Sequence, residues 1–128
     1  MRFKYTILYV EDVTRSIEFY ERAFGLERRM IVETGDYGEL VTGTTTLAFS
    51  SHGLMTELGK NPGIADFKAP VFEIAFETDD VPGSLEKAKQ AGATLIQDAS
   101  EMPWGQTISY VSDLDGYLIE ICSPVRGA

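Results

Sequence analysis

Two glutamates in strand-like segments are the residues whose types and spacing most suggest chemistry. Glu73 begins the run EIAFE and Glu120 lies within YLIEIC. Side chains of a strand alternate between its faces, so each glutamate points away from the neighbouring isoleucines. Two carboxyl groups held close together cannot both ionise at low cost, and one pKa should rise. Such a pair can serve as general acid and base, or hold a hard divalent cation. Equally, the two can simply hydrogen-bond each other, Tyr5 or trapped water.

An internal repeat must position these glutamates. The run YTILYV from Tyr5 is followed by EDV and SIE, and the run EIAFET from Glu73 is followed by DDV and SLE. Tyr5 aligns with Glu73 and Ser16 with Ser84, so the offset is 68 residues at both places. Each copy predicts a strand, a turn and a helix, and three further strand-like runs follow. We therefore expect an α+β fold of two βαβββ modules.

The boundaries follow from capping and turn residues. The first helix should begin at Asp12 or Thr14 and end at Gly25, while the second has Pro82 in its first turn and ends at Gly92. The later strands are expected at 28–33, 38–41, 45–50, 93–97, 106–112 and 117–122. We assign one domain, 1–128, with module one at 1–51 and module two at 71–125. The connection between the modules, at 52–70, should contain about one helical turn and can also cover a site.

Strand alternation predicts which side chains share an inner surface. Four strands should present Tyr5, Ala48, Glu73 and Glu120 to a common cup, with the helices outside. Tyr5 and Tyr9 on this face, Glu77 beside Glu73, and Trp104 in a rim loop are candidate ligand-binding residues. Each has a structural alternative: the tyrosines can pack with a wet hydroxyl, and Trp104 can anchor its loop. We expect the histidine His52 to be solvated and the thiol of Cys122 to be buried and inert.

Composition excludes several classes of function. The formal net charge of −9 argues against nucleic acid and anionic membranes as partners. One histidine cannot supply a metal site that needs two imidazoles, and one cysteine cannot form an internal disulfide. No apolar run reaches membrane-spanning length, and the start MRFK lacks the apolar stretch of a signal peptide. We expect a cytoplasmic protein.

Three segments resemble the vicinal-oxygen-chelate superfamily, which includes glyoxalases, bleomycin-resistance proteins and dioxygenases. YVEDVTRSIEFY with the following FGL is similar to that family's opening, DLDGYLIE to its closing motif, and MPWGQ to a segment of glyoxalase-like and bleomycin-resistance-like members. The resemblance covers nearly the whole chain. It implies a cupped mixed sheet, a homodimer, and a small molecule as substrate or ligand.

The resemblance also implies a metal site that this chain does not complete. In metal-dependent members four side chains hold one divalent ion, and the corresponding positions here are Tyr5, Ala48, Glu73 and Glu120. Only Glu120 is the usual residue. Glu73 replaces a histidine and can still coordinate, Tyr5 is a poor ligand, and Ala48 has no donor atom.

Two functions remain open. The first is a glyoxalase-like enzyme, a lyase, isomerase or dioxygenase relative acting on a small oxygenated metabolite, with Glu120 and Glu73 as base and acid or as part of a weak metal site. The second is a metal-free binding protein that sequesters an aromatic, often cationic, molecule beside Trp104, Glu77 and the glutamate pair.

Overall fold

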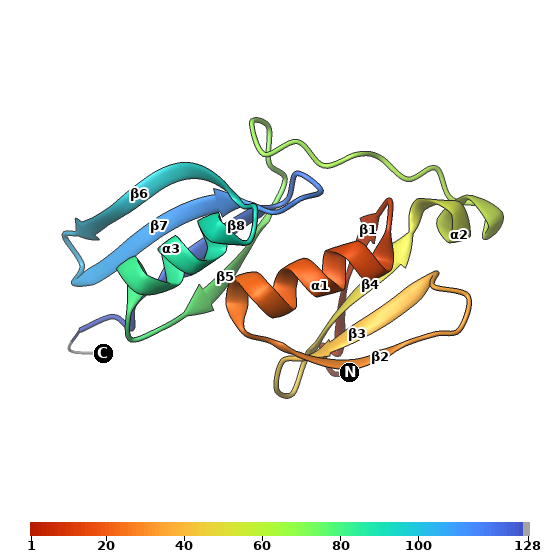
Figure 1. The fold of residues 1–128 in the computed structure, drawn as a ribbon, viewed down its shortest axis with the longest axis horizontal. Coiled ribbons are helices and arrows are strands. Elements are labelled where there is room, and N and C mark those ends of the chain that lie inside the picture. The colour runs from red at the N-terminus through yellow and green to blue at the C-terminus, as the bar shows by residue number, and fades with distance from the viewer. Residues whose placement is uncertain (127–128) are drawn as a thin grey trace. The chain divides into compact units, whose positions relative to one another are not determined.

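The computed structural model describes residues 1–126 as two compact units, Met1–Ile64 and the chain from Ala65 onward. The first unit contains β1 (Tyr5–Val10), α1 (Val13–Phe24), β2 (Glu27–Ile31), β3 (Tyr37–Val41), β4 (Thr46–Ser51) and α2 (His52–Glu57) (Figure 1). The second contains β5 (Glu73–Glu77), α3 (Val81–Gln90), β6 (Thr94–Met102), β7 (Gln106–Ser112) and β8 (Leu118–Cys122).

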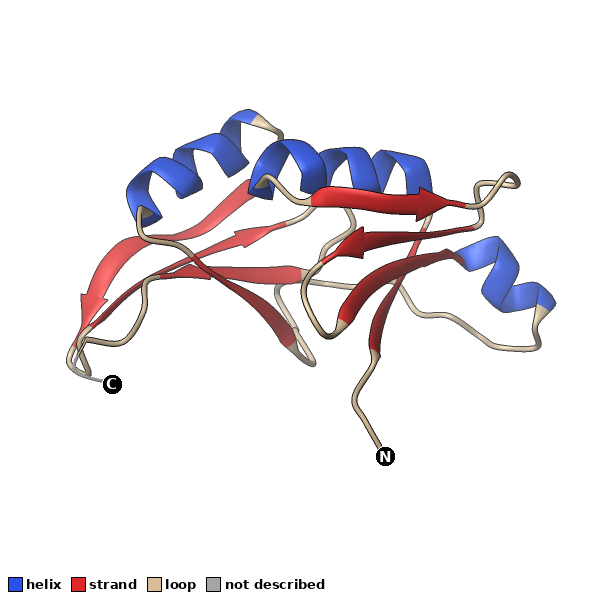
Figure 2. Ribbon diagram, turned by 90° about the horizontal axis from the view of Figure 1, so that it is seen from below, coloured by secondary structure: helices blue, strands red, loops and turns tan. Residues whose placement is uncertain are grey.

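Both units have the same sheet topology, which confirms the predicted repeat and the α+β fold. The strand orders are β1-β4-β3-β2 and β5-β8-β7-β6. In each sheet the first pair is parallel and the other two pairs are antiparallel. One long helix lies along one face of each sheet (Figure 2), so the opposite face of each sheet is the one left without a helix.

Helix α1 packs on the first sheet as its apolar spacing predicts. The Asp12 side chain caps the helix by accepting from Arg15 N at 3.1 Å, and Gly25 ends it with a φ of 67°. The ring of Tyr20, fully buried, lies 5.1 Å from the ring of Phe49 on β4. The buried residues of this core are Leu8, Val10, Val13, Ile17, Phe19, Tyr20, Ala23, Leu40, Leu47 and Phe49.

Gly38 on β3 allows α1 to approach the sheet closely. A Cβ atom at this position would lie 2.4 Å from Ile17 Cδ1 and 3.1 Å from the Met30 carbonyl oxygen. Because strand side chains alternate, Tyr37 and Glu39 on either side of Gly38 point to the face without a helix. Close packing on one face of β3 thus holds two polar side chains on the other.

Helix α3 repeats this arrangement in the second unit. Asp80 caps it by accepting from Gly83 N at 3.0 Å, and Pro82 lies in the first turn. Leu85 and Ala88 are buried, as are Ile119 and Ile121 on β8. Phe72, one residue before β5, is 48% exposed, and its ring centre lies 6.0 Å from that of Tyr117.

The turn before β8 is held by Asp113 and Gly116. Asp113 Oδ1 accepts from the backbone N–H groups of Asp115 and Tyr117, both at 2.9 Å. Gly116 has a φ of 92°, and a Cβ here would lie 2.4 Å from the Ala65 carbonyl oxygen. Only glycine at this position satisfies both the positive φ and the close approach of the Ala65 carbonyl oxygen.

Several boundaries differ from the predicted ones. Strand β6 runs to Met102, well past the predicted residue 97, because it follows β7 through two register shifts. The connection contains the predicted short helix, α2, which Ser51 caps at Leu54 N. In residues 1–126 no helix is long and apolar enough to cross a membrane.

Candidate functional site

The helix-free face of the second sheet carries the candidate acid–base residues. Glu73 and Glu77 lie on β5, Glu120 and Cys122 on β8, and Tyr110 on β7. Glu120 has Ala75 and Tyr110 as its direct partners across the two neighbouring strands, and Glu77 has Cys122. We call these five side chains the acidic face.

Glu73 and Glu120 form a hydrogen-bonded carboxyl pair on this face. They lie on adjacent parallel strands of one sheet, and Glu120 is two residues beyond Leu118, the direct partner of Glu73. Tyr110 Oη donates to Glu73 Oε2 at 3.1 Å. Sequence reasoning missed Tyr110, because the alternation in β7 places an apolar or hydroxyl side chain on both of its faces. Only pairing with β8 identifies its neighbours.

The environment raises the pKa of Glu120, as expected for one member of such a pair. Burial has the largest effect, followed by the hydrogen bond with Glu73 and the charge of Glu73. Burial, together with the charges of Glu120 and Glu73, raises the pKa of Tyr110 to about 12, so its hydroxyl stays protonated and donates. Glu120 is therefore the carboxyl group that holds a proton more readily than an isolated glutamate, while Glu73 beside it accepts from Tyr110. The acidic face thus brings together two carboxyl groups with different hydrogen-bond partners.

Cys122 is buried on the same face. Burial, with the charges of Glu120 and Glu77, raises the pKa of its thiol, against a smaller lowering by a hydrogen bond with Gln106. A protonated, buried thiol is a poor nucleophile. The expectation that Cys122 is buried is confirmed, and its inertness stays a prediction.

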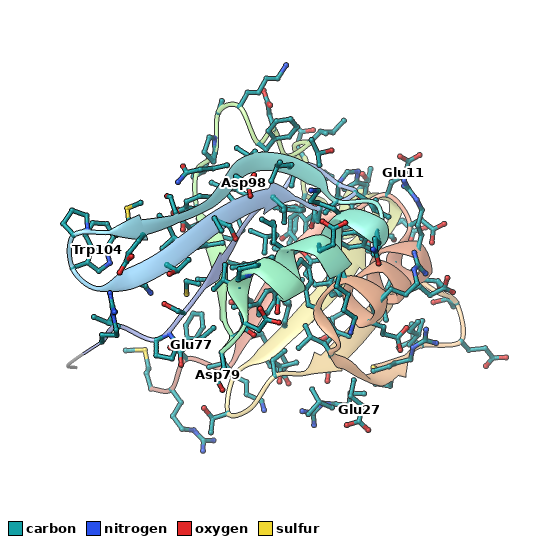
Figure 3. The ribbon with its side chains drawn as sticks, turned by 60° about the vertical axis from the view of Figure 1, so that its left-hand side comes forward. Glu11, Glu27, Glu77, Asp79, Asp98 and Trp104 are labelled. Carbon is teal, nitrogen blue, oxygen red and sulfur yellow. The ribbon has the colours of Figure 1, made fainter. Side chains whose placement is uncertain are left out.

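Trp104 stands at the tip of the hairpin between β6 and β7, as Figure 3 shows, and is 56% exposed. Its indole Nε1 donates to Gln106 Oε1 at 2.8 Å, and Gln106 Nε2 donates to the Ser123 carbonyl oxygen at 3.0 Å. The glutamine thus orients the indole ring, which leaves an exposed aromatic surface. A cavity of about 430 Å³ lies near this hairpin, and Trp104 does not line it; its lining residues are Glu101, Gly105, Thr107, Ser123, Pro124 and Arg126.

The helix-free face of the first sheet carries the tyrosines. Tyr5 is 47% exposed, and Lys4 Nζ lies 5.5 Å from its ring centre. Lys60 Nζ lies 3.3 Å from the Tyr9 hydroxyl and 5.6 Å from the ring centre, so its main contact is with the hydroxyl. Both tyrosines therefore have aromatic surface and a nearby cation, which suits a polar ligand as well as simple packing.

Ala48, expected on the inner surface, lies between its direct strand partners Ile7 and Glu39 and is 0% exposed. One prediction for this module is wrong. His52 was expected to be solvated. It is half-buried at the start of α2, and its Nε2 atom is buried with no hydrogen-bond partner among residues 1–126.

Sequence reasoning also missed Glu39. It lies on β3 as the direct partner of Ala48, accepts from the Tyr37 hydroxyl at 2.7 Å, and pairs with Arg29 Nε at 3.5 Å. Gly38 and Leu40 both face α1. Because strand side chains alternate, this pattern in the sequence could have predicted that Glu39, which lies between them, is on the opposite face.

The residues present do not fit the four-ligand metal site. Ala48 has no donor atom, and Tyr5 contributes only a phenol. No group of three or more histidine, cysteine, aspartate or glutamate side chains comes together as metal ligands in the part of the chain that the structure describes. Glu120 and Glu73 satisfy each other and Tyr110 instead, so the chemistry below uses the protein's own side chains.

Comparison with known proteins agrees with this fold. The family model for the glyoxalase-like domain matches residues 3–126. A probable lactoylglutathione lyase of Vibrio cholerae is 34% identical over 94% of this chain and 88% of the relative. A lactoylglutathione lyase of Neisseria meningitidis is 33% identical over 99% of this chain and 94% of its own length.

Solved structures show the same fold. A glyoxalase-related enzyme from Fulvimarina pelagi superposes with a TM-score of 0.83 at 21% identity, covering 96% of this chain and 88% of that one. A glyoxalase/bleomycin resistance protein/dioxygenase family enzyme from Burkholderia phytofirmans gives a TM-score of 0.75, also at 21% identity, over 94% and 96% of the two chains. The chain belongs to the glyoxalase-like domain family of the vicinal-oxygen-chelate superfamily.

Proposed function

We propose that the protein is a lyase-like enzyme that moves protons on a small hydroxy-carbonyl metabolite at its acidic face. The pair of Glu73 and Glu120 carries this proposal, because it places two carboxyl groups next to each other and raises the pKa of one of them. The lyase names of relatives about one-third identical to this chain support the reaction class.

In the proposed step Glu73 removes a proton from the carbon next to the substrate carbonyl. Glu120 gives its proton to the carbonyl oxygen, and the product is a neutral enol. Glu73 then gives its proton to the former carbonyl carbon while Glu120 takes the proton of the neighbouring hydroxyl group, which completes an isomerisation and restores both side chains. The hydrogen-bond pattern favours Glu120 as the resting acid and Glu73 as the base, which reverses the roles suggested from the sequence. Tyr110 would hold Glu73 in position through its 3.1 Å hydrogen bond.

The charge of the acidic face favours a neutral substrate. Glu77 on β5 adds to the charge of Glu73, and the whole chain has a formal net charge of −9. A substrate with carboxylates, such as a glutathione thioester, would be repelled here. We therefore expect small uncharged hydroxy ketones or aldehydes to be better substrates than lactoylglutathione.

Proton exchange with heavy water tests this function directly. The protein would be incubated in D₂O with hydroxyacetone, dihydroxyacetone or lactoylglutathione, and deuterium at the carbon next to the carbonyl would be followed by NMR. We expect exchange on a neutral compound, its loss in Glu120→Gln, and its retention in Glu86→Gln, an exposed glutamate of α3. Exchange that persists in Glu120→Gln would reject the proposal.

A second function rests on the exposed, oriented indole of Trp104. A metal-free binding protein could use this ring and Glu77 to hold a flat cationic molecule. Quenching of Trp104 fluorescence by aromatic cations, with no turnover of any compound above, would favour this function.

We further propose a cytoplasmic homodimer. The single cysteine is a buried free thiol, which is compatible with a reducing compartment. Light scattering after size exclusion would give the mass in solution, and a monomeric mass near 14.2 kDa would reject the dimer.

A further inference from the structure

The two modules place their polar groups differently on equivalent strands. In module two the central strand β8 carries Glu120, and its direct partner on β7 is Tyr110. In module one the central strand β4 carries Ala48, and its direct partner on β3 is Glu39. The carboxylate of module one, Glu39, therefore lies on β3, one strand away from the position equivalent to Glu120. Its neighbour on β4 is Ala48, whose side chain is only a methyl group.

Glu39 is held from two sides. Tyr37, two residues before it on the same face, donates its hydroxyl to Glu39 Oε2 at 2.7 Å. Burial raises the pKa of Tyr37, and Glu39 and Tyr5 raise it further, so this hydroxyl remains a donor. Arg29 Nε lies 3.5 Å from the other carboxylate oxygen. The Glu39 side chain is only 16% exposed, so both contacts are shielded from bulk water.

A bulge brings Arg29 to this face. The pairing of β2 with β3 shifts register between Arg28 and Met30, which leaves Arg29 as the extra residue. Bulges re-aim a side chain that regular alternation would place elsewhere, and they are frequent beside functional sites. Arg28, one residue earlier, pairs with Glu21 of α1 at 2.9 Å on the opposite face.

Arg29 keeps unused donors. Its side chain is 44% exposed, and among residues 1–126 its only polar side-chain contact is the one from Nε to Glu39. A guanidinium group has five N–H donors in a planar fork. The two terminal nitrogens of Arg29 are therefore available as donors beside the Glu39 carboxylate, which can still accept a hydrogen bond. The positive charge of Arg29 and the negative charge of Glu39 cancel.

We propose that Arg29, Tyr37 and Glu39 form a binding subsite for a neutral polar group that carries a hydrogen-bond acceptor and donor side by side, as a primary carboxamide does. The carbonyl oxygen accepts from Arg29 and the amide N–H donates to Glu39. A full anion is repelled by Glu39 and a full cation by Arg29. Ile7 and Tyr5, both more than two-fifths exposed on β1, give the ligand an apolar surface, so an aryl carboxamide fits best. This subsite uses residues of the first unit alone and needs no turnover to be tested.

The test is an NMR titration of ¹⁵N-labelled protein with benzamide, benzoate and benzylamine. We expect benzamide to shift the backbone amides of β3 and β4 and to bind more tightly than either ion. Arg29→Gln should weaken benzamide binding roughly tenfold, the usual effect of losing a hydrogen bond to a charged group. The matched control, Arg28→Gln, should bind as the unchanged protein does.

Each other result would overturn the proposal. Benzoate or benzylamine binding more tightly than benzamide would mean an ionic site. Equal weakening in Arg28→Gln and Arg29→Gln would mean an effect on the sheet as a whole. No shift at β3 and β4 would mean no subsite there. Because Glu120 plays no part in this titration, failure here leaves the proton-exchange result unaffected, and the reverse also holds.

Discussion

Tyr110 donates its hydroxyl hydrogen to Glu73 across 3.1 Å, although its direct strand partner is Glu120. The Tyr110 side chain reaches over the central strand β8, so its hydrogen bond links β7 to β5 across the carboxyl pair. Substitution of Tyr110 therefore tests how the carboxyl pair works.

Removal of this hydroxyl should weaken both the fold and the site. In Tyr110→Phe we expect the free energy of unfolding to fall by about 1 kcal/mol, the usual net value of one hydrogen bond. The exchange activity should fall as well, because Glu73 loses the contact that orients it. Urea denaturation measures the first effect and deuterium incorporation the second. Full activity in Tyr110→Phe would show that Glu73 needs no such support.

The raised pKa of Glu120 predicts a pH dependence of stability. In the unfolded chain this carboxyl titrates near the ordinary value of 4.5, while in the folded protein it titrates higher. Between the two values the folded state holds a proton that the unfolded state releases. The stability contributed by this group is therefore complete below the lower pKa and is lost as pH rises through the higher one.

Glu120→Gln should remove this dependence, because glutamine does not titrate. Denaturation curves at several pH values from about 4 to about 7 would show a smaller decline in the variant than in the unchanged protein. The decline that is lost in the variant measures how far folding raises the pKa of Glu120. Parallel curves would mean that the Glu120 pKa is the same in both states.

Metal binding should be weak. Ala48 supplies no ligand, and Glu73 and Glu120 already bond to each other, so we expect no tight calorimetric signal when the chelator-treated protein is titrated with Mn²⁺, Ni²⁺, Zn²⁺ or Fe²⁺. Glu120→Ala serves as the comparison. Tight binding that disappears in this variant would instead establish a rebuilt metal site.

Gly116→Ala should destabilise the second module strongly. The new Cβ would meet the Ala65 carbonyl oxygen at 2.4 Å, and the φ of 92° disfavours any side chain. Because a backbone atom cannot move aside as a flexible side chain can, we expect a loss of at least about 2 kcal/mol in unfolding free energy. Gly43→Ala is the matched control, since it shares a positive φ but has open space around it. Equal losses in the two variants would show that φ alone matters.

Much of the fold was predictable because its signals are local. Asp12 and Gly25 cap α1 where the sequence predicted, since capping depends on a side chain within one helical turn. The constant offset between Tyr5 and Glu73 predicted two modules of the same topology, which the sheet orders confirm. The length of β6 was not predictable, because its bulges depend on pairing with β7.

The candidate site divides in the same way. The sequence by itself determined that Glu73 and Glu120 share a face with one raised pKa, because alternation along a strand follows from backbone geometry. Only the tertiary structure decided that Tyr110 joins this pair and that Glu39 stands beside Ala48, since the register between strands brings together residues far apart in the chain. The bulge that turns Arg29 toward Glu39 likewise exists only through the pairing of β2 with β3.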